Sequence, residues 1–199
     1  AGYFSVLPKS QSGKPIQKYW KDSMVVETSW DNMVVTDFMD CSENRWRRRA
    51  GRSDLVRLLK GKGTAVIDFA PRRDFGRDIT RMRVHEDHLE VIDTLDPIVL
   101  IAPGVQWSLF EEGGSHTARA EIKLSETPLP IELRFGTRRI TDGDLTVMER
   151  LRDTDLHWRS WIPQLKLPDL APELVLRSAL TLRALCYGPS GGIAAAATT

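Results

Sequence analysis

The sequence predicts a mainly β protein, with an antiparallel β-sandwich followed by a short helical region. Short runs of β-branched and aromatic residues recur along the first two-thirds of the 199 residues, separated by Gly, Pro, Asp and Asn. This pattern is typical of a sandwich. After Gly143 the apolar residues change to helical spacing. We therefore expect a sandwich over residues 1–143, a linker helix and joint over 144–170, and the start of a helical domain over 171–199.

The composition is that of an ordinary globular protein. The 28 basic and 27 acidic side chains give a formal net charge of +1, which favours neither a nucleic-acid nor a membrane-surface partner. No apolar run approaches the ~18 residues that a membrane helix needs. The sequence holds two cysteines, Cys41 and Cys186, and so low a content indicates a reducing compartment. We expect a cytoplasmic location, and the pairing of the two thiols stays open.

Within the predicted sandwich, the first recognisable strand pair is a hairpin. Residues 24–30 and 33–39 are rich in β-branched and aromatic residues, and Asp31-Asn32 between them is a two-residue turn. Turn residues bound the further expected strands, which are residues 64–69, 79–84, 89–94, 98–102, 117–124 and 131–135. No long helical pattern separates these runs, so we expect antiparallel pairing.

Two helices are expected after the strands. Apolar residues recur at near-helical spacing over residues 144–159, before a break at Pro163. Residues 171–187 favour a second helix, with Pro172 near its start and Gly188-Pro189 after its end. This second helix is apolar on nearly all sides. We therefore expect it to be buried among other helices, which would follow Thr199 in a longer chain.

A basic segment at residues 45–62 is the strongest local charge feature. It holds eight Lys or Arg residues against one acid, Asp54, which is the electrostatic pattern of a nucleic-acid contact. Acidic residues precede the segment, however, and runs of charge are usually solvated. We favour a solvated loop and expect no nucleic-acid partner.

Clusters of polar residues give no catalytic or metal-binding pattern. In His85-Glu86-Asp87-His88 the two imidazoles could converge around a turn, but no Cys or third His is near, and zinc sites need more such ligands. The adjacent acids at Glu111-Glu112 and at residues 142–144 favour turns rather than an acid–base pair. We therefore expect no metal and, from spacing alone, no catalytic group.

The tryptophans offer a different surface chemistry. Aromatic faces stack on sugar rings, so Trp20, Trp30 or Trp107 on one sheet face would suit a non-catalytic carbohydrate-binding sandwich. Alternation along the strands does not reveal which face these three occupy. Trp158 and Trp161 lie three residues apart, a spacing more typical of packing at a joint between domains.

The last quarter of the chain carries the most specific motif. Residues 177–185 read R-S-A-L-T-L-R-A-L, and residues 187–199 continue Y-G-P-S-G-G-I-A-A-A-A-T-T. They resemble the first barrel helix, R-S-A-L-T-L-K-A-L, and the following turn, Y-x-P-T-G-A-I-V-A-A-P-T-T-S, of glycoside hydrolase family 15, the glucoamylase and trehalase-like enzymes. Ala197 stands where that family usually has proline.

Looser resemblances to the same family occur upstream in the correct order. Residues 19–28 and 35–39 resemble two of its strands. Residues 71–77, P-R-R-D-F-G-R, resemble its P-R-F-D-Y-G-R motif, with Arg73 in place of the aromatic residue. Residues 155–161 resemble its Trp-rich joint between domains. The resemblance thus covers nearly the whole chain.

The resemblance implies an N-terminal β-sandwich followed by a six-hairpin α/α barrel, truncated here after its first helix. It implies inverting hydrolysis of an α-glucosidic bond, in trehalose or a maltooligosaccharide, by two glutamates in barrel loops downstream of Thr199. We therefore expect no catalytic residue and no cofactor in this chain, which would be an inactive fragment whose sandwich packs on its own barrel. Thr198 and Thr199 are the residues expected near the substrate pocket. Their hydroxyls would bind substrate or, equally, cap a turn.

Overall fold

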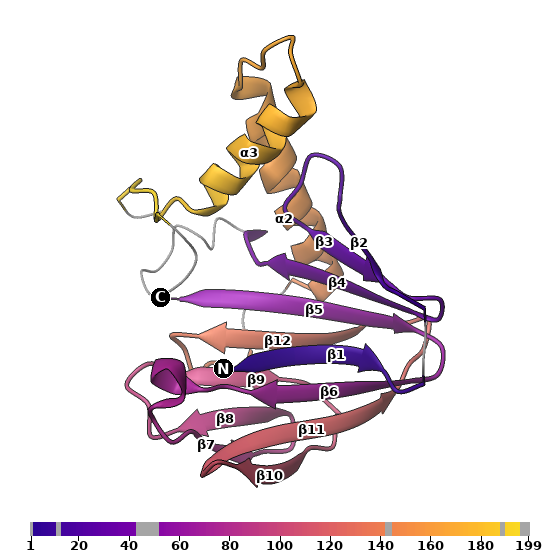
Figure 1. Cartoon of the computed structure of the whole chain (residues 1–199), viewed down its shortest axis with the longest axis vertical. Coiled ribbons are helices and arrows are strands. Elements are labelled where there is room, and N and C mark those ends of the chain that lie inside the picture. The colour runs from indigo at the N-terminus through magenta and orange to yellow at the C-terminus, as the bar shows by residue number, and fades with distance from the viewer. Residues whose placement is uncertain (1, 11–12, 43–51, 142–144, 188–189, 196–199) are drawn as a thin grey trace.

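The computed structural model describes residues 2–10, 13–42, 52–141, 145–187 and 190–195. Within these residues, strands form two antiparallel sheets, and two α-helices follow the last strand (Figure 1). The predicted mainly β sandwich is confirmed. The strands are β1 (Tyr3–Pro8), β2 (Ile16–Tyr19), β3 (Val26–Ser29), β4 (Met33–Met39), β5 (Ser53–Gly61), β6 (Thr64–Ala70), β7 (Arg81–Val84), β8 (His88–Ile92), β9 (Ile98–Ile101), β10 (Ser108–Glu112), β11 (Ser115–Lys123) and β12 (Leu129–Phe135).

The two sheets enclose one apolar core. The smaller sheet has the strand order β1-β6-β11-β10, and the larger has the order β2-β3-β4-β5-β12-β9-β8-β7. On β6 of the smaller sheet, Ile67 pairs with Val6 on one side and Ala120 on the other, and all three are buried. They pack with Leu89 and Leu100 of the larger sheet. Apolar burial between the sheets is therefore what holds the sandwich together.

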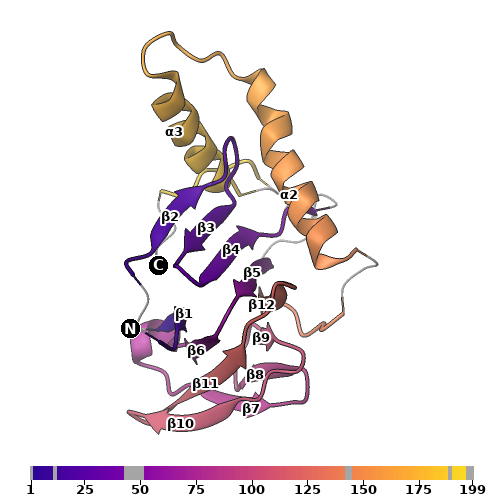
Figure 2. The same cartoon turned by 90° about the vertical axis from the view of Figure 1, so that its right-hand side faces the viewer.

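Strands β4 and β5 are buried on both faces. Val35 and Leu59 lie in the core between the sheets, whereas Phe38 and Val56 pack on the other face against Leu151 of α2 (Val147–Trp161). Side chains alternate along a strand, so strands covered on both faces need apolar residues on both. Figure 2 shows α2 and α3 (Pro172–Ala184) beyond the β2–β4 end of the larger sheet.

The expected solvated loop over residues 45–62 is wrong for residues 53–61. These residues form β5, which pairs with β4 on one side and β12 on the other. Charged residues at Arg57 and Lys60 interrupt the apolar pattern, while Val56 and Leu58 face α2. Because β5 is covered on both faces, its sequence lacks the alternation of apolar and polar residues by which a strand is recognised. Residues 45–51 lie outside the described residues.

The predicted hairpin at residues 24–30 and 33–39 is confirmed by β3 and β4, which pair with Ser29 opposite Val34. The six further predicted strands correspond to β6, β7, β8, β9, β11 and β12, and their ends differ from the predicted ends by at most two residues. Strands β1, β2 and β10 were not predicted. Each lies at the edge of its sheet, where one side of the strand is unpaired. In β2 and β10 polar residues also weaken the apolar pattern.

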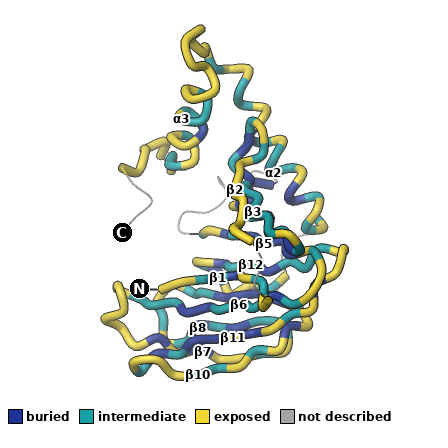
Figure 3. Tube along the Cα trace, turned by 45° about the vertical axis from the view of Figure 1, so that its right-hand side comes forward, coloured by how far each residue is buried: buried dark blue, intermediate teal, exposed yellow. Residues whose placement is uncertain are grey.

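The two predicted helices are present as α2 and α3. Thr146 and Glu149 form a reciprocal capping box at the start of α2. In the described residues Leu180 is the one buried side chain of α3, and Leu174 is 72% exposed. The expected burial of α3 among further helices after Thr199 stays a prediction. Figure 3 shows α3 as mostly exposed. None of the described helices is long and apolar enough to cross a membrane.

Candidate functional site

A buried cluster of charges fixes α2 to the sandwich. We call it the Arg150 cluster, and it consists of Asp40, Glu132, Arg134 and Arg150. Arg150 donates through Nε to Asp40 Oδ2 at 2.8 Å and through Nη1 to Glu132 Oε1 at 2.7 Å. Arg134 donates to the other carboxylate oxygen of Glu132 at 2.9 Å. The side chains of Arg150 and Asp40 are 4% and 0% exposed, so solvent screens this pair little.

The environment of Glu132 suits ion pairing rather than proton transfer. Burial alone would raise its pKa, but the hydrogen bond and charge of Arg150, reinforced by Arg134, outweigh burial and hold the pKa of Glu132 below its ordinary value. A general acid needs a pKa near the working pH. Glu132 therefore stays ionised at neutral pH and acts as a structural anion.

Helix α3 is attached to the sandwich mainly through Arg177 and Leu180. Arg177 Nη1 donates to the Ser23 carbonyl oxygen at 2.8 Å, and its guanidinium lies 4.1 Å from the centre of the Tyr19 ring. Leu180 is fully buried in a cluster with Trp158 of α2. The motif at residues 177–185 thus supplies two of the contacts that dock α3, and Leu176, just before the motif, packs in the same cluster as Leu180.

Thr198 and Thr199 lie outside the described residues, so their role as substrate-binding residues stays a prediction. The turn that precedes them is formed as the motif suggests. The backbone N–H of Tyr187 donates to the Gly192 carbonyl at 2.7 Å, and the N–H of Gly191 donates back to Tyr187 at 2.8 Å. The chain therefore folds back on itself directly after α3.

The two cysteines are free thiols. Cys41 is buried beside Trp158 and Leu180. Burial, with a smaller effect from the charge of Asp40, raises the pKa of Cys41 to about 12. Because the thiolate is the nucleophile, Cys41 is a packing residue rather than a reactive one.

Glu111 and Glu112, one of the acidic pairs singled out in the sequence, lie next to each other on strand β10. Glu111 and Glu112 end strand β10 instead of forming a turn, and the turn is made by Gly113-Gly114. Glu112 Oε2 accepts hydrogen bonds from Arg72 at 3.1 Å and from Thr117 at 2.8 Å. Residues 142–144 lie outside the described residues.

The arginines of the segment at residues 71–77 bind backbone groups of the sandwich. Arg72 Nη1 donates to the His116 carbonyl oxygen at 2.9 Å, and Arg73 Nη1 donates to the Asp93 carbonyl oxygen at 2.5 Å. The segment thereby connects the end of β6 to β11 and to the turn after β8. The motif at residues 71–77 therefore has a structural role in the sandwich.

The two histidines at the turn between β7 and β8 do converge, but with carboxylate partners. Their rings stack with centroids 4.2 Å apart. His88 Nδ1 lies 2.6 Å from Asp87, and His85 Nε2 lies 3.5 Å from Glu90. The hydrogen bond with His88 lowers the pKa of Asp87. Among the described residues, no group of three or more His, Cys, Asp or Glu side chains could hold a metal ion.

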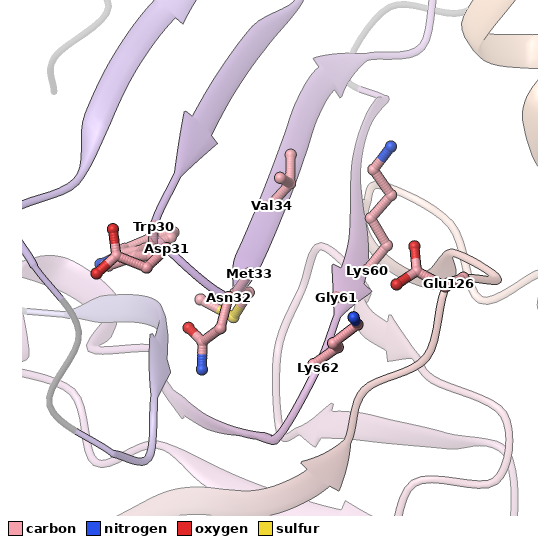
Figure 4. A pocket seen from close by; sticks show the side chains of 9 residues that line it. All are labelled: Trp30, Asp31, Asn32, Met33, Val34, Lys60, Gly61, Lys62 and Glu126. Carbon is pink, nitrogen blue, oxygen red and sulfur yellow. The ribbon is translucent and has the colours of Figure 1, made fainter.

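A shallow pocket of about 250 Å³ lies where β3 turns into β4 and β5 turns into β6. In Figure 4, Trp30 and Asp31 lie on one side, and Lys60, Lys62 and Glu126 lie on the other. Asn32 lies between them. The lining residues are Trp30, Asp31, Asn32, Met33, Val34, Lys60, Gly61, Lys62 and Glu126. The pocket therefore brings one aromatic ring close to several polar side chains.

The five tryptophans considered in the sequence divide into packing residues and one pocket residue. Trp20 packs against the β4–α2 core, and Trp107 packs against the sandwich core. Trp158 is buried and Trp161 packs beside it, which confirms their interpretation as packing at a joint. Trp30 packs on the sandwich core and also lines the pocket.

The described part of the basic segment is partly neutralised within the sandwich. Arg52 Nη2 lies 2.7 Å from Asp54 Oδ2, and Arg57 Nε lies 3.0 Å from Asp37 Oδ1. Arg57 also donates to the Phe4 carbonyl oxygen at 2.6 Å. Arg57 thus joins β5 to β4 and β1, and the two ion pairs reduce the positive charge that β5 presents to solvent.

Most of the chain matches one known protein family. Residues 1–158 match the family described as "Trehalase-like, N-terminal". The chain belongs to this family. The match includes the sandwich and nearly all of α2, so the Arg150 cluster lies inside the trehalase-like N-terminal region, and α3 follows it.

Two relatives of this trehalase-like chain are trehalases by name. The trehalase of Thermoplasma volcanium is 24% identical over 206 residues, which cover 99% of this chain and 32% of the relative. The trehalase of Mycobacterium tuberculosis is 24% identical over 234 residues, which cover 100% of this chain and 33% of the relative. The chain thus spans about a third of the length of these curated relatives.

Among solved structures, a putative kojibiose phosphorylase from human microbiome aligns with 92% of this chain and 27% of its own chain. The TM-score is 0.35 and the sequence identity is 7%. A similarity this low supports no conclusion about a shared fold or function.

Proposed function

We propose that this chain forms the N-terminal sandwich and the first catalytic-region helix of an inverting family 15 glycoside hydrolase. Its substrate would be an α-glucoside, either trehalose or a maltooligosaccharide. The observation that carries the proposal is the trehalase-like match over residues 1–158. Two relatives named trehalase, aligned over essentially the whole chain, support it.

Hydrolysis with inversion requires two carboxyl groups on opposite sides of the scissile bond. One protonates the leaving oxygen and the other activates water, at a separation of roughly 6.5–9.5 Å. In this chain Glu112 and Glu132 are each held by arginine, which suits ion pairing. We assign both catalytic glutamates to sequence that would follow Thr199, so the 199-residue chain alone would be inactive.

The sandwich would act by positioning the helices. The Arg150 cluster holds α2 on the larger sheet, and Arg177 holds α3 on the turn after β2. With both helices fixed, the turn after α3 has a defined position relative to the sandwich. Thr198 and Thr199 would follow that turn and contact the substrate or cap the chain, and the sandwich would pack on its own barrel.

The test is to express the longest reading frame that contains this chain and, separately, the 199-residue chain. We expect the longer protein to release glucose from trehalose or from maltooligosaccharides, with the β-anomer first in a proton NMR time course. The 199-residue chain should release none. Early appearance of the α-anomer would contradict inversion, and activity in the short chain would contradict the assignment of both glutamates. Because no cofactor is proposed, EDTA should leave the rate unchanged.

A further inference from the structure

The pocket beside Trp30 combines an aromatic side chain with polar side chains from three segments of the chain. Asn32 Oδ1 is buried and accepts no hydrogen bond from the described residues. A buried acceptor without a donor costs about 1–3 kcal/mol. Because Asn32 Oδ1 has almost no accessible surface, a ligand hydroxyl would reach it only after the Asn32 side chain turns toward the pocket.

The four charged side chains of the pocket balance one another without pairing. Lys60, Lys62, Asp31 and Glu126 are exposed. In the described structure none of them forms an ion pair within 4 Å of another pocket residue. Their formal charges cancel. A neutral ligand that both donates and accepts hydrogen bonds can use all four, whereas an ion would be repelled by two of them.

Backbone contacts fix the walls of the pocket before any ligand binds. The N–H of Lys62 donates to the Asn32 carbonyl at 2.8 Å, and the N–H of Gly61 donates to the Ser125 carbonyl at 2.9 Å. Gly61 has a φ of +139°, and a Cβ there would lie 2.2 Å from the Asn32 carbonyl oxygen. Only glycine permits this approach. Because the three lining segments are tied together, binding would order little of the backbone.

We propose that this pocket binds one glucose ring of an oligosaccharide. The C–H face of the ring would lie on the Trp30 indole, and its hydroxyls would reach Asn32, Lys62 and Glu126. The volume of about 250 Å³ is below the roughly 300–1,000 Å³ of pockets that enclose a drug-sized ligand. It therefore suits a single ring at the surface rather than a whole chain. The choice of glucose rests on the proposed function; the choice of a neutral polyol rests on the pocket.

The test is an NMR titration of the ¹⁵N-labelled 199-residue chain with maltotriose, cellotriose and inorganic phosphate. We expect saturable shifts of the Trp30 indole N–H and of the Gly61 and Lys62 amides with maltotriose, at a Kd on the order of 1 mM. Phosphate should give no saturable shift. The double variant Lys62→Ala/Glu126→Ala should bind maltotriose about tenfold more weakly.

The matched control is Lys123→Ala/Glu111→Ala, which removes one exposed Lys and one exposed Glu outside the pocket and should bind like the parent chain. The proposal is overturned if neither sugar gives saturable shifts, if the shifts centre on Trp161, or if phosphate binds more tightly than maltotriose. Binding of cellotriose alone would support the pocket and count against the α-glucoside substrate. Failure of the enzyme assay would leave this titration unaffected, so the two proposals fail separately.

Discussion

Arg150 joins a helix to two strands because its guanidinium faces Asp40 of the segment after β4 and Glu132 of β12. The sequence gives no sign of this role, since the three residues are separated by 110 and 18 positions. A buried ion pair adds little net stability compared with apolar packing, but removing one partner leaves the other charge buried and unpaired. The cluster is therefore more important for the position of α2 than for total stability.

Replacing Arg150 by Met should destabilise the chain by about 3–5 kcal/mol, because Asp40 and Glu132 would each lose the ion pair with Arg150 while their carboxylates stay buried. The measurement is urea unfolding followed by tryptophan fluorescence. Arg152→Met is the matched control on the same helix, where the arginine is 68% exposed and pairs with Asp153. It should change stability by less than about 1 kcal/mol. Equal losses of unfolding free energy in the two variants would show that the buried cluster contributes no more to stability than an exposed ion pair.

Cys41 and Cys186 should differ strongly in reactivity. Burial raises the pKa of Cys41 to about 12, whereas Cys186 is partly exposed at the end of α3. We expect one equivalent of thiol to react quickly with Ellman's reagent at neutral to mildly alkaline pH, and the second only after denaturation. Mass spectrometry after alkylation of the native chain should find the label on Cys186. Label on Cys41 under these conditions would contradict its burial.

At the scale of single elements, the sequence predicted most strands that form apolar runs bounded by turn residues, including β4, which is buried on both faces. The runs at residues 64–69 and 117–124 alternate in burial along most of their length, because one face meets the core and the other is partly or fully exposed. The same reasoning failed for β5, which is covered on both faces and carries Arg57 for an ion pair inside the sandwich. It also missed three of the four edge strands, β1, β2 and β10, whereas the edge strand β7 was predicted.

Leu180 is the main apolar contact of helix α3 with the rest of the chain, and Leu176 packs beside it. Leu180 is fully buried, while Leu174 on the same helix is 72% exposed. Leu180→Ala should weaken the docking of α3 by about 2–5 kcal/mol, because it removes a buried side chain and leaves a cavity. Limited trypsin digestion should then cut at Arg177 and Arg183 faster than in the parent chain, while the sandwich stays intact.

Leu174→Ala is the matched control for this prediction, and its digestion pattern should equal that of the parent chain. Faster cleavage throughout the sandwich in Leu180→Ala would mean that α3 and the sandwich unfold as one unit. Unchanged cleavage would mean that the contact of Leu180 with Trp158 does not hold α3 in place.

At the scale of the whole molecule, the sequence predicted the order of the parts but not the contacts between them. A sandwich, a linker helix and a second helix follow from local patterns over tens of residues. The Arg150 cluster, the docking of Arg177 on Tyr19 and the pocket beside Trp30 each join segments far apart in the chain. Such contacts depend on strand order and register, which local periodicity does not encode. The residues that the motif did point to, Thr198 and Thr199, lie outside the described residues.

The coupling between sandwich and helix should appear in how stability depends on pH. The pKa of Glu132 is lower in the folded chain than the ordinary value of 4.5, so between the two values the unfolded chain binds more protons. The contribution of Glu132 is therefore complete above about pH 5 and is lost as pH falls through its folded pKa. Glu132→Gln removes this titration, and its free energy of unfolding should fall less steeply with pH below that range.

The measurement is the urea midpoint of each variant at several pH values between neutral and mildly acidic. Glu121→Gln is the control, because Glu121 pairs with Lys9 at the surface, where both side chains are about half exposed. Its pH profile should follow that of the parent chain, since an exposed pair is screened by solvent. Parallel profiles for all three proteins would show that the charge of Glu132 does not stabilise the contact between α2 and the sandwich.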